Sequence, residues 1–390
     1  MEQAHSVLDT DADKSEPVML KEGEIKAILP SKPFFISSQN SESINISAKF
    51  YEFQKSAITL ANESGLILET HPHHVLALSS VLLIKPSQHH TDLLKFFKIE
   101  ELKLLRNNVL SKLAGKDYED IEFNQDIFIQ VRKIIKGFLK SSGDSITSTK
   151  ELALLLDTNH TFESKILLSL IMYMNSLPEV KFIEPLGEIE VCINLLHPLL
   201  SPLFYDKDNS FLRWCNKITE EAKESRTNVN KSRRPDAIIS TILQNHVGCN
   251  KGFGEVKVIE GLKNKYGLVK DLVRLSTFSK ESIDLNNMKC NISFQAIGGH
   301  IFFYAHTLLA DGLYAMVELC DVVAPSCSSD LLSFLSELDK LKLVYNIFVS
   351  SCKQLDTVET SWKRHTLDSP TFSQYVSKDS GKQPSHLSFD

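Results

Sequence analysis

The sequence lacks any apolar run long enough to cross a membrane, because its longest holds about nine residues where a membrane helix needs about 20. Its beginning has neither the basic nor the apolar segment of a secretion signal. Cysteine is sparse, with seven residues, none of them before Cys192 and no pair at C-x-x-C spacing. These absences argue against a membrane partner, a disulfide framework and a zinc ribbon. We expect an intracellular protein, either cytoplasmic or nuclear.

Several familiar catalytic motifs are also missing. The chain has no G-x-S-x-G elbow, no Walker A loop and no H-E-x-x-H helix. Its net charge of −6 gives no general attraction for polyanions. Residues 217–280 differ, with 13 Lys and Arg against 7 Asp and Glu, a local charge of +6 that leaves −12 elsewhere. This basic region would suit a phosphodiester substrate, although surface charge also varies this much without purpose.

The composition is that of an ordinary folded protein, with 42% apolar and 24% charged residues in 390 positions. Residues 1–47 are acidic, serine-rich and poor in apolar periodicity, which predicts a disordered arm. Residues 48–180 form a predicted helical region, and residues 181–358 a predicted domain of mixed sheet and helices. Residues 359–390 have few apolar anchors and are expected to form a flexible tail.

Apolar residues recur every three or four positions in the helical region. This pattern predicts helices over residues 48–62, 91–113, 124–140, 148–156 and 161–175. Two histidine clusters lie between the first two helices, at 71–74 and 89–90. Neighbouring imidazoles bind zinc, but neither cluster contains a cysteine or carboxylate at ligand spacing. Because Pro72 indicates a loop, we interpret both clusters as surface loops.

The mixed domain begins with a predicted helix, residues 188–200, whose apolar stripe is Ile189, Ile193, Leu196 and Leu200. Pro198 and Pro202 are expected to end it. The pattern then predicts strands over 211–215, 235–243 and 253–259, with a glycine-containing turn over 248–252. An amphipathic helix over 265–283 follows. Three antiparallel strands over 292–297, 301–309 and 313–322, and a long helix over 328–353, complete the domain.

One group of charged residues is brought together by this arrangement. Side chains alternate along a strand, so Glu255 and Lys257 share one face while Val256 points into the core. If the two strands pair as a hairpin that turns near His246, Asp236 comes alongside Glu255 and Lys257. Two carboxylates and an ammonium would then lie together at the end of a short sheet.

The residues Pro235-Asp236 and Glu255-x-Lys257 resemble the signature of the PD-(D/E)XK nuclease superfamily, whose members have the restriction-endonuclease-like fold. The blocks at 234–237, 254–257 and 310–314 are also similar to those in a set of uncharacterised fungal proteins. The superfamily resemblance covers about residues 181–325. It implies an α-β-β-β-α-β core, here extended by antiparallel strands and a long C-terminal helix.

The resemblance also implies roles for individual residues. Asp236, Glu255 and the Val256 carbonyl would bind Mg²⁺ or Mn²⁺, and Lys257 would position the attacking water. Glu190 on the first helix would complete the metal shell, in preference to Glu188, unless both are solvated surface charges. Residues proposed to grip a DNA or RNA backbone are Arg233, Arg234, Lys270 and Arg274.

Three interpretations therefore remain open from the sequence. The first is an active metal-dependent nuclease that acts on DNA or RNA. The second is a catalytically inactive nuclease-like module that serves as a nucleic-acid or protein scaffold. The third is an unrelated fold in which Asp236 and Lys257 form an ordinary cross-strand ion pair.

Overall fold

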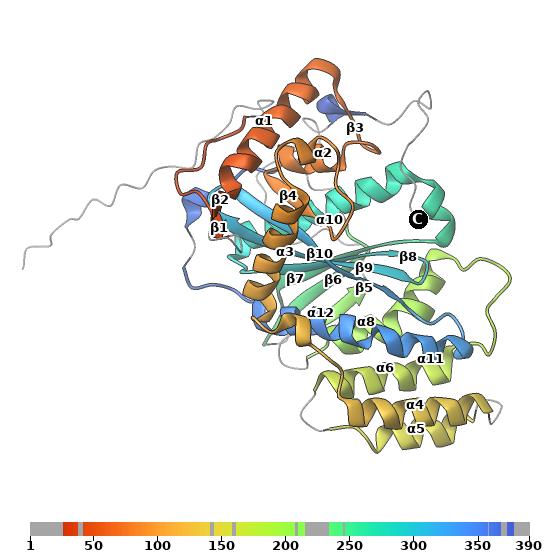
Figure 1. Ribbon diagram of the computed structural model, residues 1–390. Helices are drawn as coiled ribbons and strands as arrows, with labels where there is room; N and C mark the ends of the chain where they lie inside the picture. The colour runs from red at the N-terminus through yellow and green to blue at the C-terminus, as the bar shows by residue number, and fades with distance from the viewer. Residues whose placement is uncertain are drawn as a thin grey trace, which may run out of the picture.

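A computed structural model of the chain describes residues 26–37, 42–140, 144–157, 161–206, 210–214, 234–244, 246–357, 359–367 and 373–377. The largest sheet consists of β4 (Val81–Ile84), β5 (Ser210–Trp214), β6 (Ala237–Leu243), β7 (His246–Lys257), β8 (Asn291–Ile297), β9 (His300–Ala310) and β10 (Leu313–Val323). These seven strands lie in the spatial order β4–β10–β9–β8–β7–β6–β5 (Figure 1). The mixed helix-and-sheet class expected from the sequence is confirmed.

Helices cover both faces of this sheet. They are α1 (Ile46–Ser64), α2 (Pro72–Leu78), α3 (Ile99–Ala114), α4 (Gln125–Lys140), α5 (Ser145–Ala153), α6 (Phe162–Ser176), α7 (Glu188–Glu190), α8 (His197–Phe204), α10 (Lys265–Asn286), α11 (Leu331–Phe334) and α12 (Leu338–Ser351). Helices α10 and α2 lie over one face, and α8 and α12 lie under the other (Figure 1). The five helices expected in the helical region are confirmed as α1, α3, α4, α5 and α6.

Strand directions follow the connections between the strands. The β5–β6–β7 segment is an antiparallel meander, and β8–β9–β10 is another. Strands β7 and β8 pair in parallel, which requires a crossover, and α10 supplies it. The two tight turns of the second meander contain Gly298 and Gly312, with φ angles of +58° and +68° that favour glycine. The predicted strands and the predicted crossover helix are therefore confirmed.

The turn between β6 and β7 lies earlier than expected. The sequence predicted a turn over 248–252, but the chain turns at Gln244, whose φ is +46°, and β7 already begins at His246. The glycines that indicated a turn serve close packing instead. A Cβ atom on Gly252 would lie 2.5 Å from the carbonyl oxygen of Ile292 on the neighbouring strand. A register shift near Ser240 adds a bulge to the same hairpin.

The expected helical region is not separate from the sheet. Strand β4 comes from this region and joins the edge of the sheet, parallel to β10. One continuous hydrophobic core extends from Ile36 to Cys352, across the expected boundary at residue 180. The sequence missed β4 because all four residues, Val81–Ile84, are apolar and buried, so no alternating pattern reveals a strand.

Parts of both ends also pack onto the fold, in contrast to the expected arm and tail. Residues Phe35–Ser37 and Ser43–Asn45 form the hairpin β1–β2, and the hydroxyl of Ser31 donates to Asp311 at 2.6 Å. Near the other end, Nζ of Lys280 donates to the Thr366 hydroxyl at 3.1 Å. Strand β11 (Val376–Ser377) pairs in parallel with β3 (Leu66–Ile67). Residues 1–25 and 378–390 lie outside the described part.

The helix that precedes β5 has a different buried face from the expected one. A π-helical segment, Val191–Leu196, joins α7 to α8 and shifts the periodicity, because each π turn contains an extra residue. Ile189 and Ile193 are consequently 73% and 57% exposed, whereas Leu196 and Leu200 are buried as predicted. The expected end near the prolines is also wrong, because α8 continues past Pro202 to Phe204.

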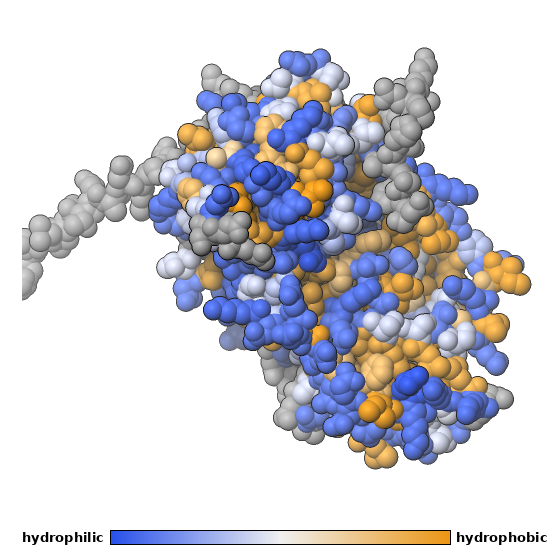
Figure 2. Space-filling model, in the orientation of Figure 1, coloured by the Kyte–Doolittle hydropathy of each residue, from blue (hydrophilic) through white to orange (hydrophobic). Residues whose placement is uncertain are grey.

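The predicted long helix over 328–353 begins with a 3₁₀ turn, Ser328–Asp330, and a second 3₁₀ turn, Leu335–Glu337, divides the rest into α11 and α12. Figure 2 shows that one face of the molecule is largely hydrophilic, with apolar side chains gathered in its lower part, where α4, α5 and α6 lie. Exposed apolar residues on these helices include Ile129, Ile146 and Leu168. In the described part of the chain, every helix is too short or too polar to span a bilayer.

Candidate functional site

The hairpin of β6 and β7 brings three predicted site residues together. The amide of Asp236 donates to the carbonyl of Gly254 at 3.1 Å, which places Asp236 beside the Glu255–Lys257 segment. Oδ2 of Asp236 accepts a second bond, of 2.8 Å, from the amide of Val256. Val256 is fully buried on the opposite face of β7, so Glu255 and Lys257 share the face that α10 covers. The predicted spatial grouping is confirmed.

Glu255 is the most buried member of this group. Its side chain is 0% exposed, and Oε2 accepts from Nη1 of Arg274 at 3.1 Å. Oε1 is also buried and has no hydrogen-bond partner among the described residues. Burial, and then the nearby charge of Asp236, raises the pKa of Glu255 to about 9, although Arg274 opposes the shift. One oxygen of this carboxyl is therefore committed to Arg274, and a cation that bound the other oxygen would have to displace the proton.

Lys257 lies at the more open side of the group. Its side chain is 31% exposed, and Nζ lies 3.2 Å from Oδ2 of Asp271 on α10. Burial alone would lower the pKa of Lys257, but the charges of Asp271 and then Asp236 raise it above the ordinary value. The ammonium is therefore charged at neutral pH. Nζ also donates to the carbonyl of Val256 at 3.0 Å.

Helix α10 contributes two residues whose place in the site the sequence did not reveal. Asp271 is buried beside Lys257, and Arg274 contacts both Asp271, at 3.3 Å, and Glu255. The expectation that Arg274 grips nucleic acid is corrected, since its guanidinium is held within the site. Their spacing, three residues apart on a helix, was the available signal. Spacing alone does not show which face of α10 meets the sheet.

Two of the other residues expected to grip a nucleic-acid backbone are exposed. Arg234 is exposed, and its carbonyl accepts a hydrogen bond from Nη2 of Arg274. Lys270 is exposed on the same helix as Arg274, with Nζ 5.9 Å from the ring centre of Tyr266. Arg233 lies outside the described residues. Two exposed cations therefore flank the cluster.

The first helix supplies Glu188, and not the preferred Glu190. Oε2 of Glu190 accepts from the amide of Gly187 at 2.7 Å, so this side chain caps the start of its own helix. Although the Glu188 side chain is exposed, partial loss of hydration and then the nearby charge of Asp236 raise the pKa of Glu188, so its carboxyl lies within electrostatic reach of the cluster. Cys192, one turn further along, is influenced by the same carboxylates. The π-helical turn begins just after Glu190, and no sequence pattern indicated it.

The carboxylates of this group meet part of what a divalent cation with oxygen ligands requires. Oε1 of Glu255 is a buried acceptor without a partner among the described residues, and Asp236 lies beside it. Mg²⁺ uses one or two carboxylates and retains several waters, so two acids suffice. The Val256 carbonyl, the third expected ligand, already accepts a hydrogen bond from Nζ of Lys257, which leaves one of its two lone pairs for a metal. These acids do not form a preassembled cage of three or more ligand groups.

Among the described residues, such a cage occurs elsewhere, where donor atoms of His74, His90 and Asp92 lie within 4.8 Å of one another.

Comparison with known proteins finds no matching family model, no matching curated protein and no matching solved structure. The functional argument therefore depends on the geometry of the two sites.

Proposed function

We propose that this protein is a metal-dependent phosphodiesterase of the PD-(D/E)XK type that acts on DNA or RNA. One observation carries the proposal: Asp236, Glu255 and Lys257 lie together at one end of the β6–β7 hairpin, on the face covered by α10. The group is reachable from solvent, because Glu188 is exposed and Lys257 is partly exposed.

The order of the surrounding elements supports the same proposal. The helical segment α7–α8 is followed by β5, β6 and β7, then by α10 and by β8 parallel to β7. This is the α-β-β-β-α-β order that the resemblance implies. The acidic residues lie at the positions expected from that order. Glu188 is on the first helix, Asp236 precedes the second strand, and Glu255 is on the third strand.

The chemistry follows from the charges of these residues. A bound Mg²⁺ would polarise the phosphodiester and make a bound water more acidic. Asp236 and Glu255 would hold the ion, with Glu188 as an outer carboxylate. Lys257 is cationic and would orient the attacking water and balance the charge that develops on the phosphate oxygens. Asp271, at 3.2 Å from Lys257, fixes the position of the ammonium.

The substrate class follows from the cations near the site. Arg234 and Lys270 are exposed beside the acidic group, and residues 217–280 carry a charge of +6 in a protein of net charge −6. Exposed cations of this kind neutralise phosphates along a nucleic-acid backbone without reading its sequence. We therefore infer a nucleic acid as substrate, with binding that weakens as the salt concentration rises.

Cleavage assays with matched variants test the proposal. Purified protein would be incubated with single-stranded DNA, double-stranded DNA and RNA, in Mg²⁺ and in Mn²⁺. We expect cleavage that Asp236→Asn and Lys257→Met each reduce by at least about a hundredfold, with unchanged circular dichroism. Lys103→Ala, which alters an exposed cation on α3 outside residues 217–280, is the control and should retain activity. Cleavage that survives in Lys257→Met, or no cleavage of any substrate, would contradict the proposal.

A second candidate is a nuclease-like module that binds nucleic acid without cutting it. The ion pair between Arg274 and Glu255 favours it, because a fixed guanidinium occupies part of the space beside a required carboxylate. Binding without cleavage, weakened by Arg234→Ala and by salt, would be its signature. If Arg274→Ala then produced Mn²⁺-dependent cleavage, the guanidinium would be identified as the block.

A further inference from the structure

The first of the two histidine clusters is not a surface loop, whereas the second lies in a loop as expected but is half-buried. His73 and His74 lie on α2 and are only 5% and 1% exposed, which corrects the interpretation made from Pro72. The second cluster belongs to the connection between β4 and the 3₁₀ turn Leu93–Lys95, and it folds back onto α2. The ring centres of His74 and His90 are 4.7 Å apart, with perpendicular planes. A buried group of imidazoles therefore lies beside the edge strand of the sheet.

A carboxylate that the sequence analysis overlooked completes this group. Oδ2 of Asp92 lies 3.4 Å from Nε2 of His74 and 3.6 Å from Nδ1 of His90. The other oxygen, Oδ1, pairs with Nζ of Lys95 at 2.6 Å, which leaves Oδ2 directed at the imidazoles. Asp92 follows His90 by two residues, so the signal was present in the sequence.

The distances favour ligands around an ion over a hydrogen-bonded cluster. N–H···O hydrogen bonds measure about 2.7–3.2 Å, so both contacts of Oδ2 are too long. Zinc bonds of about 2.0–2.1 Å at a tetrahedral centre separate two ligand atoms by about 3.4 Å. The observed separations of 3.4 and 3.6 Å match this edge length. The three donor atoms all lie within 4.8 Å of one another, so one ion can contact all three.

Unpartnered ring nitrogens argue against a hydrogen-bonded histidine cluster, and they are different atoms from the two that face Asp92. Among the described residues, both ring nitrogens of His73 and of His89, and Nδ1 of His74, are buried without a hydrogen-bond partner. Each buried polar atom left in this state costs about 1–3 kcal/mol, so such a concentration needs an explanation.

We propose that His74, His90 and Asp92 bind one Zn²⁺ ion, with water in the fourth position. Two imidazoles and a carboxylate are ligands that zinc accepts. Nδ1 of His90 would exchange its 3.1 Å hydrogen bond from the Asp92 amide for the metal. His71 is not counted as a ligand, because it is not among the residues whose donor atoms lie within 4.8 Å of one another.

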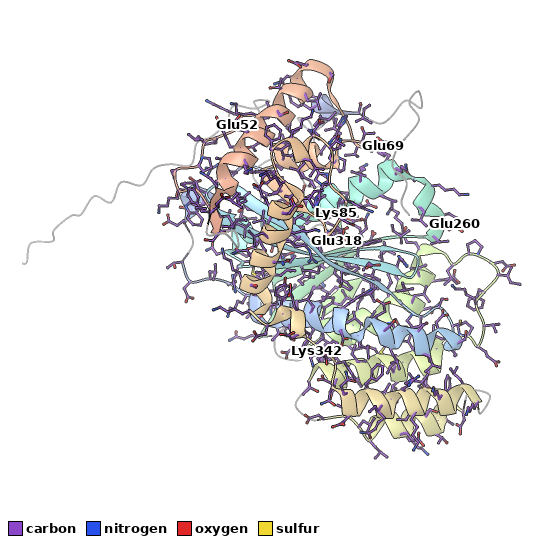
Figure 3. The ribbon with its side chains drawn as sticks, in the orientation of Figure 1. Glu52, Glu69, Lys85, Glu260, Glu318 and Lys342 are labelled. Carbon is purple, nitrogen blue, oxygen red and sulfur yellow. The ribbon has the colours of Figure 1, made fainter. Side chains whose placement is uncertain are left out.

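The ion would fasten the connection after β4 to the helix that precedes it. Lys85, the first residue of this connection, is held by Glu318 on β10 at 3.3 Å, and Figure 3 shows the two side by side. The far end of the connection would be held by zinc through His90 and Asp92. Since β4 is an edge strand, clamping both ends would stabilise the edge of the sheet.

Zinc binding to tag-free, full-length protein tests this site. We expect about one zinc per chain by elemental analysis after dialysis, and a rise in melting temperature on addition of Zn²⁺ but not of Mg²⁺. His90→Ala and Asp92→Asn should each weaken zinc binding at least about a hundredfold in competition with a coloured chelator. His300→Ala alters an exposed histidine outside the group and is the matched control.

Two further measurements distinguish a zinc site from a histidine cluster that binds no metal. Asp92 is partly exposed, so Asp92→Asn should fold and keeps the test valid if a histidine variant does not. Co²⁺ in place of Zn²⁺ should give the visible absorption of a tetrahedral site, lost in Asp92→Asn. Absence of zinc from the wild type, or equal affinity in the wild type and Asp92→Asn, would overturn the proposal. Preferential retention of iron would contradict the choice of ion.

Discussion

Nη1 of Arg274 lies 3.1 Å from Oε2 of Glu255, and this contact joins helix α10 to a wholly buried carboxyl on strand β7. Removing one partner of a buried charged pair leaves the other without compensation. Because burial already favours the protonated form of Glu255, we expect Arg274→Ala to lower the free energy of unfolding by about 3 kcal/mol, the low end for such pairs. Urea denaturation would measure it.

Lys270→Ala is the matched control for this variant, because Lys270 lies on the same helix and is exposed. We expect it to change stability by less than about 0.5 kcal/mol. Equal stability of Arg274→Ala and the wild type would show that the guanidinium contributes nothing at Glu255.

The raised pKa of Glu255 makes stability depend on pH. Its ordinary value is 4.5 and its value in the fold is about 9, so the folded state binds more protons between these limits. Stability should therefore fall as pH rises through this window, by at most about 1.4 kcal/mol per unit. Glu255→Gln removes this dependence while it keeps the shape of the side chain.

Comparison of wild type and Glu255→Gln isolates this effect, because the raised pKa values of Glu188 and Asp271 are present in both proteins. We expect the variant to gain stability relative to the wild type as pH rises from 5 to about 8.5. A difference that stays constant over this range would show that Glu255 is ionised throughout.

Close packing of β7 against β8 predicts a strong effect of a single methyl group. A Cβ on Gly254 would meet the ring of Phe294, which also packs against Trp214 and Phe303 with ring centres 6.3 Å away in each case. We expect Gly254→Ala to cost about 1–3 kcal/mol in thermal or urea unfolding. Phe294→Leu in the same chain should restore part of this loss.

Gly137→Ala is the control for backbone effects, because a Cβ there meets nothing within 4 Å and Gly137 lies inside α4. It should stabilise the protein by about 0.5–1 kcal/mol through helix propensity alone. Destabilisation of similar size in both glycine variants would refute the packing explanation.

Two neighbouring glutamates should have different effects. The carboxyl of Glu188 lies within electrostatic reach of the acidic cluster, so Glu188→Gln should weaken Mn²⁺-dependent cleavage by about tenfold with little change in stability. Glu190 caps its helix at Gly187, so Glu190→Gln should cost at most about 1 kcal/mol of stability and leave cleavage unchanged. If Glu190→Gln weakened cleavage and Glu188→Gln did not, Glu190 would be the carboxylate near the metal, as first inferred from the sequence.

Local patterns in the sequence predicted the hairpin and the crossover helix because these elements have clear periodicity. Alternation placed Glu255 and Lys257 on one face, and the Pro-Asp start of β6 placed Asp236 beside them. The edge strand β4 could not be predicted in the same way, because its four residues are uniformly apolar and its partner lies about 230 positions away.

The site residues that were missed depend on rotation of helices about their axes. Which face of α10 meets the sheet decides whether Arg274 contacts Glu255 or solvent, and spacing within the helix is compatible with both. The π-helical turn after Glu190 likewise changes the phase of the first helix. Asp92 was missed for a different reason, since its histidine partner at position 74 is distant in the sequence.

The most direct test of the account is Mn²⁺ binding at Asp236 and Glu255. Mn²⁺ would be titrated into the His90→Ala protein, in which the histidine group is disabled, and free ion followed by electron paramagnetic resonance. The account predicts one bound Mn²⁺ per chain, with affinity at least about tenfold lower when Asp236→Asn is added. Equal Mn²⁺ binding with and without Asp236→Asn, or no binding in either protein, would contradict it.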